Sequence, residues 1–288
     1  MIRRFAGSLA TLSCAVLICA FMAQGAIIAT DNFTYSLGEL SGNNGGTGWN
    51  SAWSSDTGVT QVVDPGTPLT YSVPGDGAFQ GGNRAVQVDG NSDNAIYRSF
   101  SSFSGTDLFF SFLIRVEAGS VLNPNDFASF WFDNVATGSH NGVPSIGVKA
   151  DGGDGSITSD VMSRVQLGSE AYSTPLSTGT TYFIVGHLFK SNPAGNFDRF
   201  EHWVNPTFSS QGSPLATSSG VGTQSSLSIL GLRSANLDPG DSILFDQVTL
   251  GTEWADVVTG IPEPALTWIA GGLLLGLGFF KRSSFPRR

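Results

Sequence analysis

Residues 107–119 read DLFFSFLIRVEAG, and this stretch decides the fold. Apolar side chains recur at every second position, so one face of an extended chain carries Leu108, Phe110, Phe112, Ile114 and Val116. This period of two predicts a β-strand, because successive side chains of a strand point to opposite faces of the sheet.

Eleven further segments are short, rich in β-branched and aromatic residues, and separated by turn residues. They span 58–64, 69–73, 84–89, 94–100, 127–134, 145–150, 160–168, 180–190, 198–205, 225–234 and 242–251. A parallel sheet would need crossover helices, and the body offers only a helical turn in TEWADVV at 252–258. We therefore predict an all-β fold, a two-sheet antiparallel jelly-roll sandwich, flanked by an N-terminal signal helix and a C-terminal transmembrane helix.

Residues 1–25 have the pattern of an export signal peptide. Arg3 and Arg4 precede an apolar run over 9–22. Ala23 and Gly25 then have the small-residue spacing that a signal peptidase accepts, which places cleavage before Ala26. We expect the mature body to begin there.

The segment 260–288 combines a short motif, an apolar run and a basic end. Residues 265–280 carry no charge, and as a helix they would extend about 24 Å, somewhat less than the hydrocarbon core of a bilayer. Lys281, Arg282, Arg287 and Arg288 follow as a cytoplasmic stop. We expect a transmembrane helix at 265–280 that contacts membrane lipid and leaves the body outside.

The motif Pro262-Glu263-Pro264, ahead of such a helix and basic end, closely resembles the PEP-CTERM sorting tail of bacterial surface proteins. The resemblance implies that these three residues are a sorting and processing motif for an exosortase-type membrane enzyme. It also implies an exported precursor anchored in the inner membrane, which is then delivered to the cell surface or to an extracellular exopolysaccharide matrix.

The charge and the cysteine content of the body exclude nucleic-acid binding and stabilisation by disulfides. The stretch 26–260 holds 8 basic and 22 acidic residues, a net charge of −14. Such a surface repels nucleic acid, because binding it requires Lys and Arg to displace counterions, so we expect no nucleic-acid partner. Cys14 and Cys19 both lie in the signal, so core burial must stabilise the body without disulfides.

The body at 26–259 opens with DNFTYSLGELSGNNGGTGWNSAWSS, contains FDRFEHWVNP and closes with ILFDQVTLGTEWADVV. These segments resemble the laminin-G-like, concanavalin-A-like jelly rolls found ahead of PEP-CTERM tails. The resemblance implies two curved sheets whose concave face or rim loops, in some relatives, hold carbohydrate or calcium. We expect Trp49 and Trp53 of the opening segment to cap one end of the core.

The residue patterns of hydrolytic and nucleophilic catalysis are absent from the body. Glycosidases on this fold carry Glu-x-Asp-x-x-Glu on one strand, whereas here the nearest acidic pair, Asp198 and Glu201, falls on opposite faces. There is no Gly-x-Ser-x-Gly elbow, zinc-ligand spacing or thiol nucleophile. We interpret His140, His187 and His202 as structural or solvated. We therefore predict that the protein is not an enzyme.

Two kinds of binding site stay open. A sugar would stack on an exposed aromatic ring, for which Trp131 and Trp203 are the candidates, with burial in the core as the alternative. A calcium ion is the one cofactor that the sequence suggests, because Asp89, Asn91 and Asp93 alternate as oxygen ligands could. The Gly and Glu of an EF-hand are missing there, and an ordinary turn is the alternative. The turn DGGDG at 151–155 is a weaker second candidate for calcium.

These features predict an exported surface or matrix protein, sorted through its C-terminal motif and helix. Its body would be a non-catalytic interaction or carbohydrate-binding module, with polysaccharide as a partner. Two alternatives remain: a glycan-active enzyme with an unrecognised site, and a purely structural matrix component without a ligand.

Overall fold

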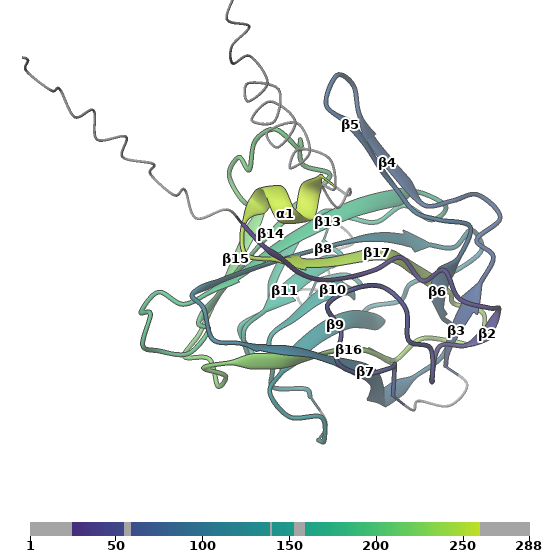
Figure 1. The fold of residues 1–288 in the computed structure, drawn as a ribbon. Helices are drawn as coiled ribbons and strands as arrows, with labels where there is room; N and C mark the ends of the chain where they lie inside the picture. Colours follow the sequence, from purple (N-terminus) through teal and green to yellow (C-terminus); the bar gives the residue numbers. More distant parts are fainter. Residues whose placement is uncertain (1–24, 55–58, 139, 153–158, 260–288) are drawn as a thin grey trace, which may run out of the picture.

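The computed structural model describes residues 25–54, 59–138, 140–152 and 159–259, without the side chains of 92–95. In these residues two antiparallel sheets pack face to face (Figure 1). The predicted signal helix up to residue 24, and the whole of 260–288 with its helix, PEP motif and basic residues, lie outside the described residues. Among the described residues, no helix combines the length and apolar character needed to cross a bilayer.

The larger sheet has nine strands, and β1 (Ile27–Asp31) pairs with β17 off its main path. In spatial order, that path runs through β15 (Ala216–Ser219), β14 (Arg199–Val204), β13 (Thr181–Phe189), β8 (Asp107–Val116), β17 (Ile243–Gly251), β6 (Ala85–Val88), β3 (Thr60–Val63) and β2 (Gly38–Glu39).

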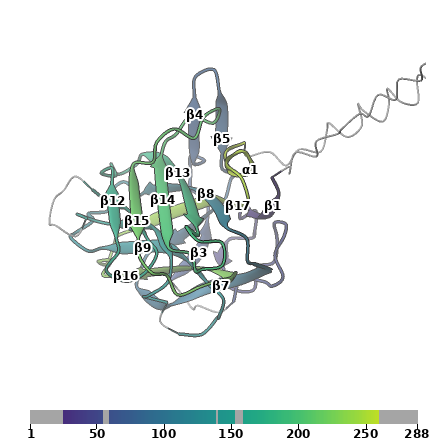
Figure 2. The same ribbon diagram turned by 90° about the vertical axis from the view of Figure 1, so that its left-hand side faces the viewer.

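The smaller sheet has six strands. In spatial order they are β12 (Ala171–Ser173), β11 (Val161–Arg164), β10 (Ser145–Lys149), β9 (Phe127–Asp133), β16 (Leu227–Ala235) and β7 (Ser92–Phe103). Two elements lie outside both sheets: a hairpin formed by β4 (Thr70–Val73) and β5 (Gly77–Gln80), and the helix α1 (Trp254–Val258). Figure 2 shows the hairpin projecting from the body next to α1.

The main core lies between the two sheets and is rich in phenylalanine. Phe110 and Phe112 of β8 meet Phe130 of β9 edge to face, with ring centroids 5.2 and 5.1 Å apart. All five residues predicted on one face of β8 are buried in this core. The alternation of side chains therefore assigned that face correctly.

The outer face of the larger sheet is buried as well. Phe109 and Leu113 of β8 pack there with Trp203, Val257 and the hairpin residue Phe79. The hairpin and α1 cover this face, which explains why β8 is apolar at nearly every position. The outer face of the smaller sheet is less covered, and the candidate site lies on it.

Every predicted strand segment contains a strand, and the predicted helical turn is α1. The all-β antiparallel sandwich is therefore confirmed for the described residues. Five strands were not predicted, and four of these have four residues or fewer: β2, β5, β12 and β15.

Candidate functional site

Three cations of the body gather on the outer face of the six-stranded sheet. They are Arg233 on β16, Lys149 on β10 and Arg164 on β11. The guanidinium carbons of Arg233 and Arg164 lie 5.4 and 5.7 Å from the ring centroid of Phe127 on β9. Two arginines that start from different strands thus converge on one aromatic ring.

The strands β9 and β10 lie between the strands that carry the two arginines, and they present small residues on this face. Arg233 pairs with Ser129 of β9, and Ser129 pairs with Gly147 of β10. A Cβ atom at Gly147 would lie only 2.4 Å from the carbonyl oxygen of Ala128, so this position needs glycine. We infer that the low surface here lets the long side chains of Arg233 and Arg164 reach Phe127.

The cations line a groove of about 400 Å³. Amide side chains surround them, and the other lining residues include Asn125, Asn141, Asn236 and Leu167. Leu167 is 62% exposed, which leaves an apolar side chain at the edge of a polar groove. Cations, amides and an exposed apolar contact are groups that can hold a polar, anionic ligand.

Among the residues that the structure describes, three cations and one carboxylate line this groove. The carboxylate is Glu170, whose Oε1 lies 3.2 Å from Nη1 of Arg164. Burial lowers the pKa of Arg164, and the nearby charge of Arg233 lowers it further, while Glu170 opposes both effects. Nε of Arg164 is buried without a hydrogen-bond partner among the described residues. A bound anion would relieve the repulsion between the two guanidinium groups.

The remaining cations of the body lie outside this groove. Lys190 donates to the carbonyl oxygens of Ser104 and Ser225. Four arginines each lie beside one carboxylate: Arg84 by Asp64, Arg98 by Asp31, Arg115 by Glu117 and Arg199 by Asp198. The groove is therefore a local positive site on an acidic body.

A tyrosine lies next to the groove on the edge strand β12. The ammonium of Lys149 is 5.9 Å from the ring centroid of Tyr172. Tyr172 is also close enough to Arg164 for their charges to interact. A phenol and an ammonium group, both able to carry a proton, therefore lie beside Arg164 at this end of the groove.

Trp131 shares this face but does not present its ring to solvent. It is fully buried, and His140 stacks on it with ring centroids 3.6 Å apart. Nδ1 of His140 lies 3.0 Å from Oδ2 of Asp133, which fixes the ring over the indole. The next residue, Asn141, lines the groove, so the segment that covers Trp131 also forms one groove wall.

Trp203 is buried on the outer face of the other sheet. It is 3% exposed and meets Trp254 of α1 edge to face at 5.3 Å. The predicted sugar-stacking role needs an exposed ring, and this structure exposes neither Trp203 nor Trp131. The alternative of core burial describes both residues, because loops and α1 cover the two faces.

The predicted calcium ligands do not form a cluster in the described residues. Asp89 is exposed, and the amide of Asn91 is held by the backbone of Leu237, with hydrogen bonds of 3.0 and 2.8 Å. The side chain of Asp93, and Asp154 of the second turn, lie outside the description. No group of three or more His, Cys, Asp or Glu side chains among the described residues could hold a metal ion. Calcium stays a prediction.

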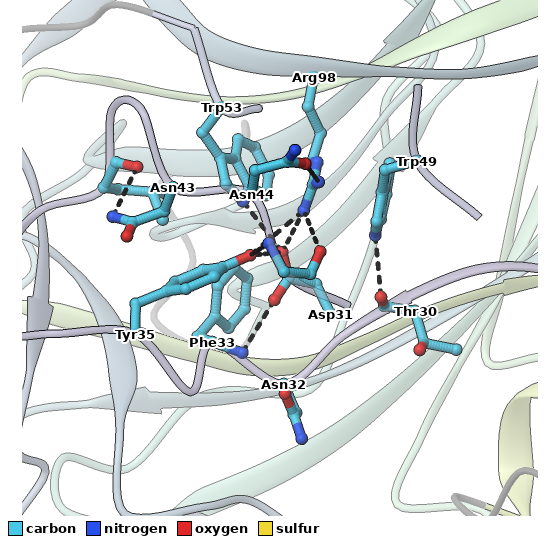
Figure 3. Close-up of polar contacts among 12 residues, drawn as sticks. Thr30, Asp31, Asn32, Phe33, Tyr35, Asn43, Asn44, Trp49, Trp53 and Arg98 are labelled. Carbon is cyan, nitrogen blue, oxygen red and sulfur yellow. Dashed lines mark hydrogen bonds and ion pairs between the residues drawn. The ribbon is translucent and has the colours of Figure 1, made fainter. Parts of the chain in front are cut away.

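A second polar cluster joins the opening segment to β7 (Figure 3). Nη1 of Arg98 lies 2.5 Å from Oδ2 of Asp31, and both side chains are fully buried. The guanidinium lies 4.5 Å from the ring of Trp49 and 5.4 Å from that of Trp53. Tyr35 and Trp53 donate to the same carboxylate at 2.7 and 3.0 Å. Trp53 is buried in the core and Trp49 packs against it, which agrees with the predicted structural role of both residues.

Comparisons with known proteins do not assign a family to the chain. No protein-family model matches it, and no curated protein matches it. Solved structures match at low identity. One is alginate lyase Aly36B with an alginate tetrasaccharide, at 15% identity and a TM-score of 0.45, covering 78% of this chain and 96% of that one.

Two further structures illustrate the range of these matches. The binding domain of Paraclostridial Mosquitocidal Protein 1 has 17% identity and a TM-score of 0.45, over 81% of this chain and 51% of that one. The endo-β-1,4-glucuronan lyase of the fungus Trichoderma reesei has 12% identity and a TM-score of 0.36, over 77% and 97%. At such TM-scores the likeness does not assign an activity to this chain.

These matches do correct one prediction. We predicted that the chain is not an enzyme, but polysaccharide lyases are among the structures that match it over nearly their full lengths. The exclusion of catalysis is therefore withdrawn. It rested on the absence of paired carboxylates and nucleophiles, and proton-transfer chemistry such as elimination requires neither of these.

Proposed function

We propose that the chain is an exported surface or matrix protein whose sandwich holds an acidic, uronate-containing polysaccharide. The ligand would lie in the groove over the six-stranded sheet. The observation that carries this proposal is the convergence of Arg164 and Arg233 on Phe127, with Lys149 beside them, on a body of net charge −14. Planar guanidinium groups match the geometry of carboxylates.

Binding to purified polysaccharides tests this proposal directly. We expect the body to bind polyuronates such as alginate or polygalacturonate, and not a neutral glucan, in calorimetric titrations. Arg164→Gln and Arg233→Gln should each weaken binding at least tenfold, because a charge-assisted contact is lost. Arg199→Gln is the matched control: it removes the same charge outside the groove, from an arginine beside Asp198. Equal binding by all three variants would refute the proposal.

A second candidate function is cleavage of that polysaccharide by β-elimination, which the position of Tyr172 favours. A base would take the proton on C5, α to the carboxylate, and the electron pair would form the C4–C5 double bond. The C4–O bond would break, and the leaving oxygen would take up a proton. Tyr172 and Lys149 are the proton-carrying groups, and Arg164 would neutralise the carboxylate.

Turnover separates cleavage from binding alone. Elimination creates a double bond conjugated to the carboxylate, so product release is followed by ultraviolet absorbance. We expect Tyr172→Phe to abolish this signal while polyuronate binding stays within twofold of wild type. Binding without any absorbance change in the wild-type protein would leave the binding function and reject the lyase.

Delivery to the surface is part of the same proposal. The export signal would direct the body across the membrane, and the tail with Pro262, Glu263 and Pro264 would be processed by an exosortase-type enzyme. The PEP-CTERM resemblance supports this route. Cell fractionation, with mass spectrometry of the mature C-terminus, tests it: full-length protein in the cytosol with an intact tail would contradict the route.

A further inference from the structure

We infer that the α1 region contains a receptor site for the amino group that is created when the signal peptide is removed. This inference concerns maturation and is independent of the groove. It rests on the predicted cleavage before Ala26. The site consists of Asp256 and Thr252, and Thr252 contacts Ala26, the residue before β1. Figure 1 shows α1 near the start of β1.

The chain at residues 25–26 runs directly against Asp256. A Cβ atom on Gly25 would lie 2.7 Å from both carboxylate oxygens of Asp256, so this position tolerates only glycine without a shift. The backbone nitrogen of Ala26 donates to Oγ1 of Thr252 at 2.9 Å, and that hydroxyl lies 3.4 Å from Oδ2 of Asp256. The nitrogen that cleavage would convert into an ammonium thus already shares a hydroxyl with this carboxylate.

The surrounding hydrogen bonds fix Asp256 in place. Its Oδ2 accepts the backbone N–H groups of Thr252 and Glu253, each at 2.9 Å. A hydrogen bond from Thr252 N to Ala26 O, at 3.2 Å, holds the other side of the chain. The carboxylate is therefore preorganised at the point where the new charge would appear, which lowers the cost of forming an ion pair.

The charged group beside Ala26 is acidic: Asp256 of α1, with Glu253 at the N-cap of the same helix. The charged residue of β1, Asp31, is buried with Arg98, and that of β17, Asp246, lies five residues from Gly251, the partner of Ile27. An ammonium at Ala26 would offset the charge of Asp256. α1 ends at Val258, shortly before the predicted tail at 260–288. An ion pair between Ala26 and Asp256 would therefore hold α1, from which the tail continues in sequence, to the start of β1.

The test compares two forms of the body that differ at the N-terminus. Each form is made once with the wild-type Asp256 and once with the substitution Asp256→Asn. One form begins at Ala26, released from a removable fusion, and the other retains residues 21–25. At pH 6 we expect the unfolding equilibrium constant of the Ala26 form to be roughly two- to fivefold lower than that of the extended form. The difference should disappear above the pKa of an α-amino group, about 8.

Combining the two changes identifies the partner of the amino group. If that partner is Asp256, the higher stability of the Ala26 form should disappear in Asp256→Asn, so the effects of the two changes on stability are not additive. Asp64→Asn, which removes an exposed charge near Arg84, should leave that higher stability unchanged. Equal stability of the two forms at pH 6, or an advantage that survives Asp256→Asn, would overturn the inference.

A second measurement does not depend on the variant folding. Titration of the isotope-labelled α-amino group by NMR should give a pKa above that of a peptide with the same first five residues. A pKa equal to that of the peptide would also overturn the inference.

Discussion

Asp246 is a buried carboxyl group in an irregular part of β17. It is fully buried and lies where the pairing of β17 with β8 shifts register. Its oxygens accept backbone N–H groups from Gln247 at 2.7 Å and Gly82 at 3.1 Å. Burial raises the pKa of Asp246 to about 7, these hydrogen bonds oppose the rise, and Asp31 adds to it.

This pKa predicts that stability falls as the pH rises. The folded state holds the Asp246 proton more tightly than the unfolded state, so the stabilisation is complete below about pH 4 and is lost as the pH rises to about 7. Denaturant unfolding of Asp246→Asn should lack this component, which we place at roughly 2–4 kcal/mol. Asp64→Asn is an exposed control and should keep it. An unchanged slope in Asp246→Asn between pH 4 and pH 7 would disprove the prediction.

His202 connects the two sheets and titrates with the opposite sign. Its ring nitrogens lie 2.8 Å from Oγ of Ser163 and 2.6 Å from Oγ of Ser173. Burial lowers its pKa from 6.5 to about 4. Its neutral ring therefore contributes stability above about pH 6.5, and this contribution is lost as the pH falls through 4.

We expect His202→Gln to be less stable than wild type at pH 7 by roughly 1–3 kcal/mol, with the difference shrinking toward pH 4. The measurement is the free energy of unfolding of both proteins across this pH range. His187→Gln, a substitution of the half-buried histidine beside Asp107, controls for loss of a histidine. A difference that stays constant with pH would show that His202 contributes by packing alone.

At the scale of elements, the close approach of β16 and β9 depends on Gly231. A Cβ atom there would lie 2.1 Å from ring carbons of the buried Trp131. Gly231→Ala should therefore destabilise the fold by roughly 1–3 kcal/mol in denaturant unfolding, because the indole has no space to move. Gly142→Ala is the matched control, since a Cβ there meets nothing within 4 Å. Equal stability of the two variants would contradict this account of the packing.

The alternation of apolar residues predicted the strands that bury one or both of their faces. The alternation in β8 identified its core-facing side chains, but not the burial of its other face, because α1 and the β4–β5 hairpin come from distant sequence. Edge strands such as β12 and β15 gave little signal, since their side chains are mostly polar or small and only partly buried. Arg98 alternates with the core residues Ile96 and Phe100 of β7, but nothing in the pattern identified Asp31 as its buried partner.

At the scale of the whole molecule, the sequence predicted the sandwich but not the groove. Lys149, Arg164 and Arg233 belong to three strands, and only the strand order places them on one face. The sequence did contain an indication of the groove. Each of the three cations alternates with core-facing residues of its strand and so belongs to the outer face, and the body has few cations. Periodicity also did not show which of the two readings applies to Trp131 and Trp203. Both are buried, because segments distant in sequence cover them.

The contrast between a positive groove and an acidic body predicts an unusual salt dependence for polyuronate binding. At low ionic strength, charges act over about 30 Å, so the net −14 body should slow the approach of a polyanion. At about 0.1 M salt the range shrinks to about 10 Å, and the association rate should rise because long-range repulsion is screened. The dissociation rate should rise as well, since the contacts with Arg164 and Arg233 are weakened. Stopped-flow association and surface-plasmon dissociation rates measure the two effects separately. An association rate that falls as salt is added would mean that a wider positive field, and not the local groove, guides the polysaccharide to the protein.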